Sequence, residues 1–271
     1  RWHNFYLEGL RFLIERTGID GLYLDGIGYD REIMKRVRRV MKKANPNSRI
    51  DFHSGDNWSP PWLSEPPLSS PANEYMEHFP YLDTLWLGEL YDYNLPPDYW
   101  LVEISGIPFG LMGDMLQDGG NPYRGMIYGM TGRERHPSAA HIWQLWDDFG
   151  IQDAEMLGYW RKECPVRTDH PDVLVTVYRK KGKSLLALAS WAKEDVQVHL
   201  QIDWRALGIR PDRCRITAPA VLHVQSPTRF SPDQPIPVPA GKGWLLVLDE
   251  DLGTSPLSSS AGLVREDGDS R

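Results

Sequence analysis

The chain has 271 residues, 41% hydrophobic and 25% charged, which is enough apolar material for one or two globular domains. Its 30 Lys and Arg residues against 37 Asp and Glu give a net charge of -7, which argues against a protein that binds nucleic acid. No run is long and apolar enough for a membrane-spanning segment. The two cysteines, Cys164 and Cys214, are too few for a disulfide framework, although they could pair with each other.

The first predicted elements are a helix, a strand and a second helix. Residues 4–17 carry apolar side chains at helical spacing, and Gly18 is the residue type that ends helices in a left-handed conformation. The apolar run at 21–25 predicts a strand that is buried on both faces and ends in Asp25. Apolar residues return at helical spacing over 30–44, so this helix should cover a sheet with one stripe.

The alternation continues as far as about residue 160. Strands are predicted at 49–53 and 81–89, separated by a loop rich in Pro and Ser. Helices at 97–104, 123–130 and 138–149 and a short strand at 108–115 complete this part. Such alternation is typical of parallel βαβ units with right-handed crossovers.

The pattern changes after residue 171. Strands at 173–179, 184–190 and 196–202 predict an antiparallel meander, and later strands at 215–224 and 244–248 complete a small β-sandwich.

These elements define an α/β fold class. A complete (β/α)8 barrel takes roughly 250 residues, more than precede the sandwich. We therefore predict the C-terminal half of a TIM-type barrel at 1–160, an antiparallel β-sandwich domain at 171–250 and a disordered tail at 251–271. Because the first residue is Arg, we expect the other strands and any targeting segment to lie upstream. The compartment therefore stays unknown, and an extracellular or other secretory location is compatible with the sequence.

Two acidic residues follow apolar strands and are the candidate catalytic pair. Active sites of parallel barrels lie at the carboxyl ends of the strands, where Asp25 and Glu89 are expected. Glycosidic cleavage needs two carboxyl groups, so we predict Asp25 as nucleophile or stabiliser and Glu89 as acid/base. The alternative for Asp25 is that it caps the following turn. The alternative for Glu89 is an exposed loop acid or an ion-pair partner of an arginine such as Arg124.

Candidate substrate-binding residues surround these acids in the sequence. Sugars bind through polar groups that hydrogen-bond their hydroxyls and through aromatic rings that face the pyranose. Asp114 follows the next candidate strand and could bind a hydroxyl or cap a helix. Trp100 is a further possible aromatic platform, although most such aromatic residues pack in the core. The predicted substrate-binding set is His53, Asp56, Asn57, Trp58, Trp86, Tyr91, Asp114 and Arg124.

No cofactor or metal site is predicted. Gly26 and Gly28 follow a strand, but Arg31 occupies the third glycine position of a dinucleotide-binding motif. His136 and His141 do not form an HExxH pattern, so the sequence does not support a zinc site.

Three segments resemble proteins similar to glycoside hydrolase family 123. They are GLYLDG at 21–26, LWLGE at 85–89 and NPYRGM at 121–126. The resemblance implies a barrel with an appended β-sandwich. It also implies the activity of that family, whose enzymes are N-acetyl-hexosaminidases that use an adjacent Asp-Glu pair together with the substrate's acetamide. The only such pair here, Asp249-Glu250, follows the last predicted sandwich strand and does not match that position. Acids on alternate strands instead resemble the α-galactosidase clan.

We therefore expect a glycoside hydrolase that cleaves O-glycosidic bonds of an oligo- or polysaccharide. The alternative is a non-catalytic carbohydrate-binding or scaffold protein on a truncated barrel. A third reading is an isomerase or lyase that uses the same acids. The expected partner is a carbohydrate, and the sequence does not define the oligomeric state.

Overall fold

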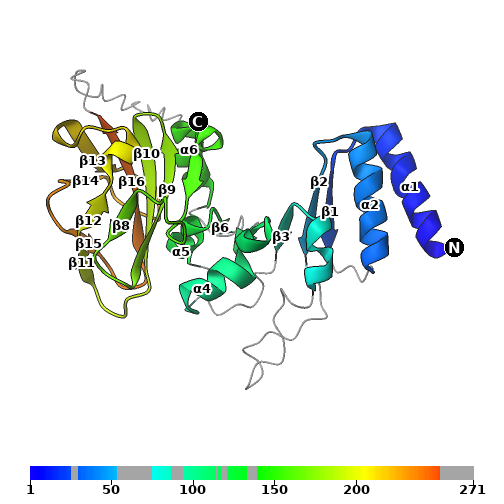
Figure 1. Ribbon diagram of the computed structural model, residues 1–271, viewed down its shortest axis with the longest axis horizontal. Coiled ribbons are helices and arrows are strands. Elements are labelled where there is room, and N and C mark those ends of the chain that lie inside the picture. The colour runs from blue at the N-terminus through cyan, green and yellow to red at the C-terminus, as the bar shows by residue number, and fades with distance from the viewer. Residues whose placement is uncertain are drawn as a thin grey trace, which may run out of the picture.

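The computed structural model describes residues 1–25, 30–53, 75–86, 94–113, 115–116, 121–132 and 139–250. Two helices and parallel strands form one end of the molecule, and antiparallel sheets form the other (Figure 1). Among the described residues, none of the helices is long and apolar enough to cross a bilayer. The predicted tail and the loop after residue 53 lie outside the described residues.

The N-terminal part is a parallel sheet with helices on one side. Its strands pair in the order β1-β2-β3-β4, and all three pairings are parallel. This confirms the predicted partial barrel sheet. The elements are α1 (Trp2–Thr17), β1 (Gly21–Asp25), α2 (Arg31–Ala44), β2 (Arg49–His53), β3 (Thr84–Trp86) and β4 (Met112–Gly113).

Both helices begin or end where the sequence indicates. Gly18 follows α1 with φ 71°, and its N–H donates to the Ile14 carbonyl. The side chain of Asp30 accepts a hydrogen bond from the Ile33 N–H and so caps α2. Four of the five apolar residues expected on the stripe of α2 are buried, namely Ile33, Met34, Val37 and Met41, and the fifth, Val40, is half-buried.

The prediction that β1 is buried on both faces was wrong. Leu24 is buried and packs in the core with residues of α1 and α2, but Tyr23 and Asp25 are exposed. The two helices cover only one side of β1 and β2 (Figure 1). The strand alternates between a helix-facing apolar side and a polar side, as expected for period 2.

The middle of the chain is more irregular than predicted. Residues 76–81 form a 3-10 helix that contains Pro80, so the described strand in this region is only Thr84–Trp86. Pro108 likewise lies in a 3-10 helix, where a strand was expected. Short elements fill the rest: α4 (Pro97–Tyr99) running into a π-helix (Trp100–Ile104), β5 (Met115–Leu116), α5 (Pro122–Ile127), β6 (Thr131–Gly132) and α6 (Ala139–Phe149).

The C-terminal part consists of antiparallel sheets, as predicted. A six-stranded sheet has the order β14-β13-β16-β10-β9-β7, and two small sheets pair β11 with β15 and β12 with β8. The strands are β7 (Glu155–Leu157), β8 (Val166–Thr168), β9 (Val173–Lys180), β10 (Lys183–Ser190), β11 (Val196–Val198), β12 (Leu200–Ile202), β13 (Cys214–Ala218), β14 (Thr228–Phe230), β15 (Ile236–Val238) and β16 (Gly243–Glu250).

The predicted meander holds only for its first two strands. β9 and β10 form a hairpin, but the residues expected as its third strand divide into β11 and β12 and pair elsewhere. β7, from the segment assigned to the barrel, pairs with β9. Both cysteines are free, and burial raises the pKa of the Cys214 thiol to about 11.

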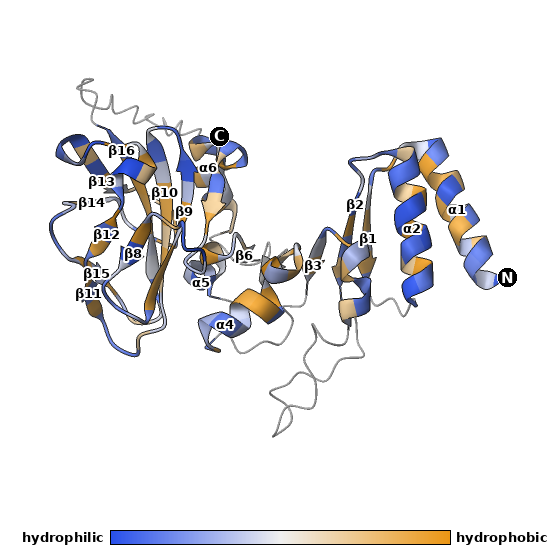
Figure 2. Cartoon of the chain, viewed as in Figure 1, coloured by the Kyte–Doolittle hydropathy of each residue, from blue (hydrophilic) through white to orange (hydrophobic). Residues whose placement is uncertain are grey.

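The long strands of the six-stranded sheet are buried on both faces. In β10, Leu186 and Leu188 pack in the core of the antiparallel sheets, whereas Leu185 and Ala187 belong to the core shared with the N-terminal part. Figure 2 shows the resulting hydrophobic character of these strands. One sheet therefore joins the two parts of the chain.

Two side chains of β9 bind the end of α5. Tyr178 donates its hydroxyl hydrogen to the Met126 carbonyl at 2.7 Å, and Thr176 donates to the Ile127 carbonyl at 2.7 Å. The last carbonyls of a helix have no partner within the helix, and Thr176 satisfies that of Ile127. The Met126 carbonyl also accepts from the Gly129 N–H, so Tyr178 is an additional donor to it.

An ion pair fastens α2 to the amino ends of β2 and β3. Asp83 accepts hydrogen bonds from both terminal nitrogens of Arg38 and from the Ile50 N–H. Burial raises the pKa of Asp83, but these hydrogen bonds and the charges of Arg38 and Lys42 outweigh it and leave the pKa below its ordinary value.

We predict that Asp83→Asn lowers the free energy of unfolding at pH 7 by about 1–3 kcal/mol, because Arg38 loses its counter-charge. A lowered folded-state pKa stabilises the protein above the unfolded value of about 4, and this contribution disappears as the pH falls through the folded-state pKa. Urea unfolding at pH 7 and near pH 3 should therefore show the difference shrinking in acid. The control is Glu15→Gln, which removes an exposed partner of Arg11. An equal difference at both pH values would contradict this role of Asp83.

Candidate active site

The carboxyl ends of three neighbouring strands bring three predicted site residues together. Asp25 is level with His53 in the pairing of β1 and β2, and His53 is level with Trp86 in the pairing of β2 and β3. In-register residues of parallel strands project from the same face of a sheet. Asp25, His53 and Trp86 therefore form a row, which we call the carboxyl-end row.

The row is held by one hydrogen bond and one ring stack. His53 Nδ1 lies 2.8 Å from Asp25 Oδ1. The rings of His53 and Trp86 stack with centroids 4.3 Å apart and an interplanar angle of 20°. The Asp25 side chain is 61% exposed, whereas that of His53 is 9% exposed, and Trp86 is 5% exposed. The carboxylate is thus the accessible group of the row, and the two rings lie behind it.

A second set of polar side chains lies two residues before the carboxyl-end row on each strand. Tyr23, Asp51 and Thr84 are in register across β1, β2 and β3. The Thr84 hydroxyl donates to Asp51 Oδ1 at 2.8 Å. The Tyr23 ring is half exposed, with its centroid 6.2 Å from that of His53.

Tyr23, Asp51 and Thr84 were not among the predicted site residues. The signal in the sequence was their spacing, because each lies two residues before a member of the carboxyl-end row and so shares its face. The strands read as apolar runs, which concealed this alternation.

Several predicted site residues lie outside the described part of the chain. The structure therefore does not place the second carboxylate or most of the predicted sugar-binding groups. These residues are Glu89, Asp56, Asn57, Trp58, Tyr91 and Asp114.

Arg124 does not belong to the carboxyl-end row. It is 5% exposed, its Nε donates to the Ser190 carbonyl at 3.2 Å, and its guanidinium lies over the ring of Trp191 at 4.9 Å. Its Nη1 also donates to Asn94. Because these contacts join α5 to the C-terminal sheets, they give Arg124 a structural role that the sequence did not reveal.

Trp100 was a possible sugar platform, and this expectation was wrong. The side chain is fully buried and stacks on Tyr128 with ring centroids 5.8 Å apart. Burial also raises the pKa of Tyr128, whose hydroxyl donates to the Pro97 carbonyl. Trp100 is a core residue, so it presents no ring face to a substrate.

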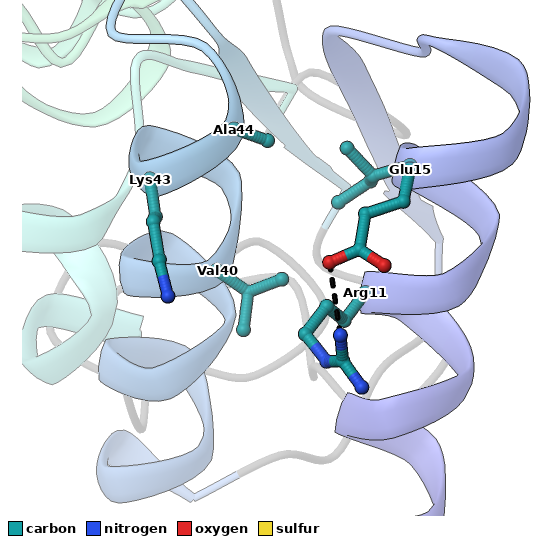
Figure 3. Close-up of a pocket in the computed structure, with 6 residues that line it drawn as sticks. Arg11, Glu15, Val40, Lys43 and Ala44 are labelled. Carbon is teal, nitrogen blue, oxygen red and sulfur yellow. Dashed lines mark hydrogen bonds and ion pairs between the residues drawn. The ribbon is translucent and has the colours of Figure 1, made fainter.

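A hollow of about 180 Å³ between α1 and α2 is not the site (Figure 3). Arg11 and Glu15 form an ion pair at its rim, at 2.9 Å, and Lys43 lies opposite. α2 runs from the carboxyl ends of the strands toward their amino ends, so this hollow lies away from Asp25. Within the described ranges, no group of three or more His, Cys, Asp or Glu residues is placed to hold a metal ion.

The Asp249-Glu250 pair lies at the end of β16, in the C-terminal sheet. Asp249 forms an ion pair with Arg215, and Glu250 forms one with Arg210. Neither acid belongs to the carboxyl-end row, in agreement with the sequence interpretation.

Comparison with solved structures identifies the fold class as that of TIM-barrel glycosidases. An α-amylase from Geobacillus thermoleovorans, complexed with acarbose, has a TM-score of 0.50 and 11% identity, and the match covers 92% of this chain and 64% of that one. An Anoxybacillus α-amylase has a TM-score of 0.54 and 9% identity, and the match covers 93% of this chain and 64% of that one. A glycoside hydrolase family 5 protein from Bacteroides vulgatus has a TM-score of 0.51 and 10% identity, and the match covers 92% of this chain and 66% of that one. The chain thus spans less than two thirds of the length of these structures.

The chain belongs to glycoside hydrolase family 123. The TIM-barrel domain of that family matches residues 1–135, and its C-terminal domain matches residues 138–249. This confirms the resemblance found in the three sequence segments. The comparison with curated protein sequences gives no match.

We predict that Arg124→Leu destabilises the fold by about 2–4 kcal/mol, because the buried Ser190 carbonyl loses a charged donor and Trp191 loses its cation contact. Thermal unfolding of the variant measures the effect. Arg161→Leu, at a half-exposed arginine, is the control and should unfold close to the wild type. Unchanged stability of Arg124→Leu would contradict the structural role.

Proposed function

We propose that the chain cleaves O-glycosidic bonds of an oligo- or polysaccharide with Asp25 and Glu89 as its two carboxyl groups. The observation that carries the proposal is the exposed Asp25 carboxylate at the carboxyl end of a parallel strand, backed by two buried rings. Membership of a glycoside hydrolase family and the TIM-barrel fold support the reaction class.

In this proposal Asp25 acts as nucleophile or stabiliser. One of its oxygens, Oδ1, is engaged by His53, and the exposed side chain leaves the carboxylate accessible to a sugar ring. Glu89 follows β3 in the sequence by three residues and is proposed as the acid/base that protonates the leaving oxygen. A carboxyl separation of about 5–5.5 Å implies retention of configuration, and one of about 6.5–9.5 Å implies inversion.

Substrate contacts are proposed for the polar and aromatic residues that follow β2, β3 and β4 in the sequence. Their side chains would hydrogen-bond sugar hydroxyls or face the pyranose ring. These residues are Asp56, Asn57, Trp58, Tyr91 and Asp114.

We predict that Asp25→Asn and Glu89→Gln each lower kcat by about 1,000-fold or more, because each removes one of the two carboxyl functions. The assay is hydrolysis of 4-nitrophenyl hexosides and N-acetyl-hexosaminides, with circular dichroism to verify folding. Asp20→Asn is the matched control, since Asp20 is an exposed acid just before the amino end of the same strand. Full activity in both amide variants would refute the pair.

A non-catalytic carbohydrate-binding protein would behave differently in the same experiment. A polysaccharide in the gel would slow its migration in affinity electrophoresis, but the protein would hydrolyse none of the glycosides. That result would overturn the hydrolase proposal.

A further inference from the structure

We propose that His53 is a positioning residue that aims the Asp25 carboxylate, rather than a group that binds the sugar. The inference rests on the proposed function of Asp25. It concerns how the carboxylate is held, which the sequence left open by placing His53 among the substrate-binding residues.

The first argument is accessibility. The His53 side chain is 9% exposed and lies beside an Asp25 side chain that is 61% exposed. A group that hydrogen-bonds a sugar must reach the surface of the site, and here the carboxylate reaches it while the imidazole lies behind. The depth of His53 therefore fits a supporting role.

The second argument is the hydrogen bond itself. In its proposed role Asp25 is ionised, and an ionised carboxylate only accepts hydrogen bonds, so His53 Nδ1–H is then the donor to Asp25 Oδ1 across the contact of 2.8 Å. This bond fixes the imidazole tautomer and limits rotation of the carboxylate. Preorganised orientation of a reacting group contributes directly to rate.

The third argument is that His53 is itself held. Its ring stacks on the buried ring of Trp86 at 4.3 Å, and strand pairing keeps Asp25, His53 and Trp86 level. A positioning group must lose little freedom when it acts, and stacking on a buried indole meets this requirement. Trp86 thus supports His53, and His53 supports Asp25.

Two substitutions separate the donor from the ring. His53→Phe keeps a flat ring against Trp86 but removes the donor. His53→Asn removes the ring, yet its Nδ2 lies two bonds beyond Cβ, as Nδ1 of histidine does, and can donate to Asp25. We expect His53→Phe to lower kcat by about 10- to 100-fold with little change in KM. A loss of this size is typical when a residue that orients a functional side chain is removed.

His53→Asn should recover most of the kcat lost in His53→Phe. In an Asp25→Asn background, His53→Phe should cause no further loss, because the two residues act as one unit. A raised KM in both single variants, with kcat retained, would overturn the inference in favour of sugar binding. Additive losses in the double variant would also overturn it.

A measurement without substrate keeps this inference separate from the proposed function. Long-range proton–nitrogen NMR spectra of the wild-type chain should show His53 protonated on Nδ1, and this preference should weaken in Asp25→Ala. A neutral His53 protonated only on Nε2 would exclude the donor role even if Asp25 proves essential. Absence of all glycoside hydrolysis, with the Nδ1 tautomer observed, would instead refute the hydrolase proposal.

Discussion

The in-register parallel pairing of β1, β2 and β3 is the constraint on which the candidate site depends. Backbone pairing alone sets Asp25, His53 and Trp86 level, although they come from three separate segments of the sequence. A shift of one residue in any strand would turn its side chain to the helix-covered face. The core residues Leu24, Phe52 and Leu85 oppose such a shift, because their burial against the helices fixes the face that each strand presents.

A second constraint joins this sheet to the rest of the molecule. The six-stranded sheet is buried on both faces, so the C-terminal part is packed to the middle of the chain rather than tethered to it. Tyr178 and Thr176 bind the carbonyls at the end of α5, and Arg124 bonds to the Ser190 carbonyl. The polar side chains on this interface thus bind backbone carbonyls at the end of the helix α5 and at the end of the strand β10.

The sequence predicted helices and strands better than it predicted which faces of a strand are covered and which residues a side chain contacts. Gly18 marks the end of α1 through local chemistry, and that prediction was confirmed. Whether β1 was covered on one side or both depends on what packs against it, which no local pattern records. Arg124 shows the same limit, because its contacts with Ser190 and Trp191 come from distant parts of the chain and cannot be read from the local sequence. The strand-end acid Asp25 could be recognised because its position follows from the strand itself.

Two acids of the parallel sheet, Asp25 and Asp83, show why one end of the sheet is interpreted as a candidate site and the other as a structural contact. Asp83 lies at the amino ends of the strands, where both terminal nitrogens of Arg38 and a backbone N–H engage its carboxylate. Its side chain is 26% exposed, so little of its hydrogen-bonding capacity faces solvent. Asp25, at the carboxyl ends, is 61% exposed and accepts from His53 through one oxygen. A carboxylate that is oriented yet still accessible has capacity left for a substrate, and one that is fully engaged serves the fold.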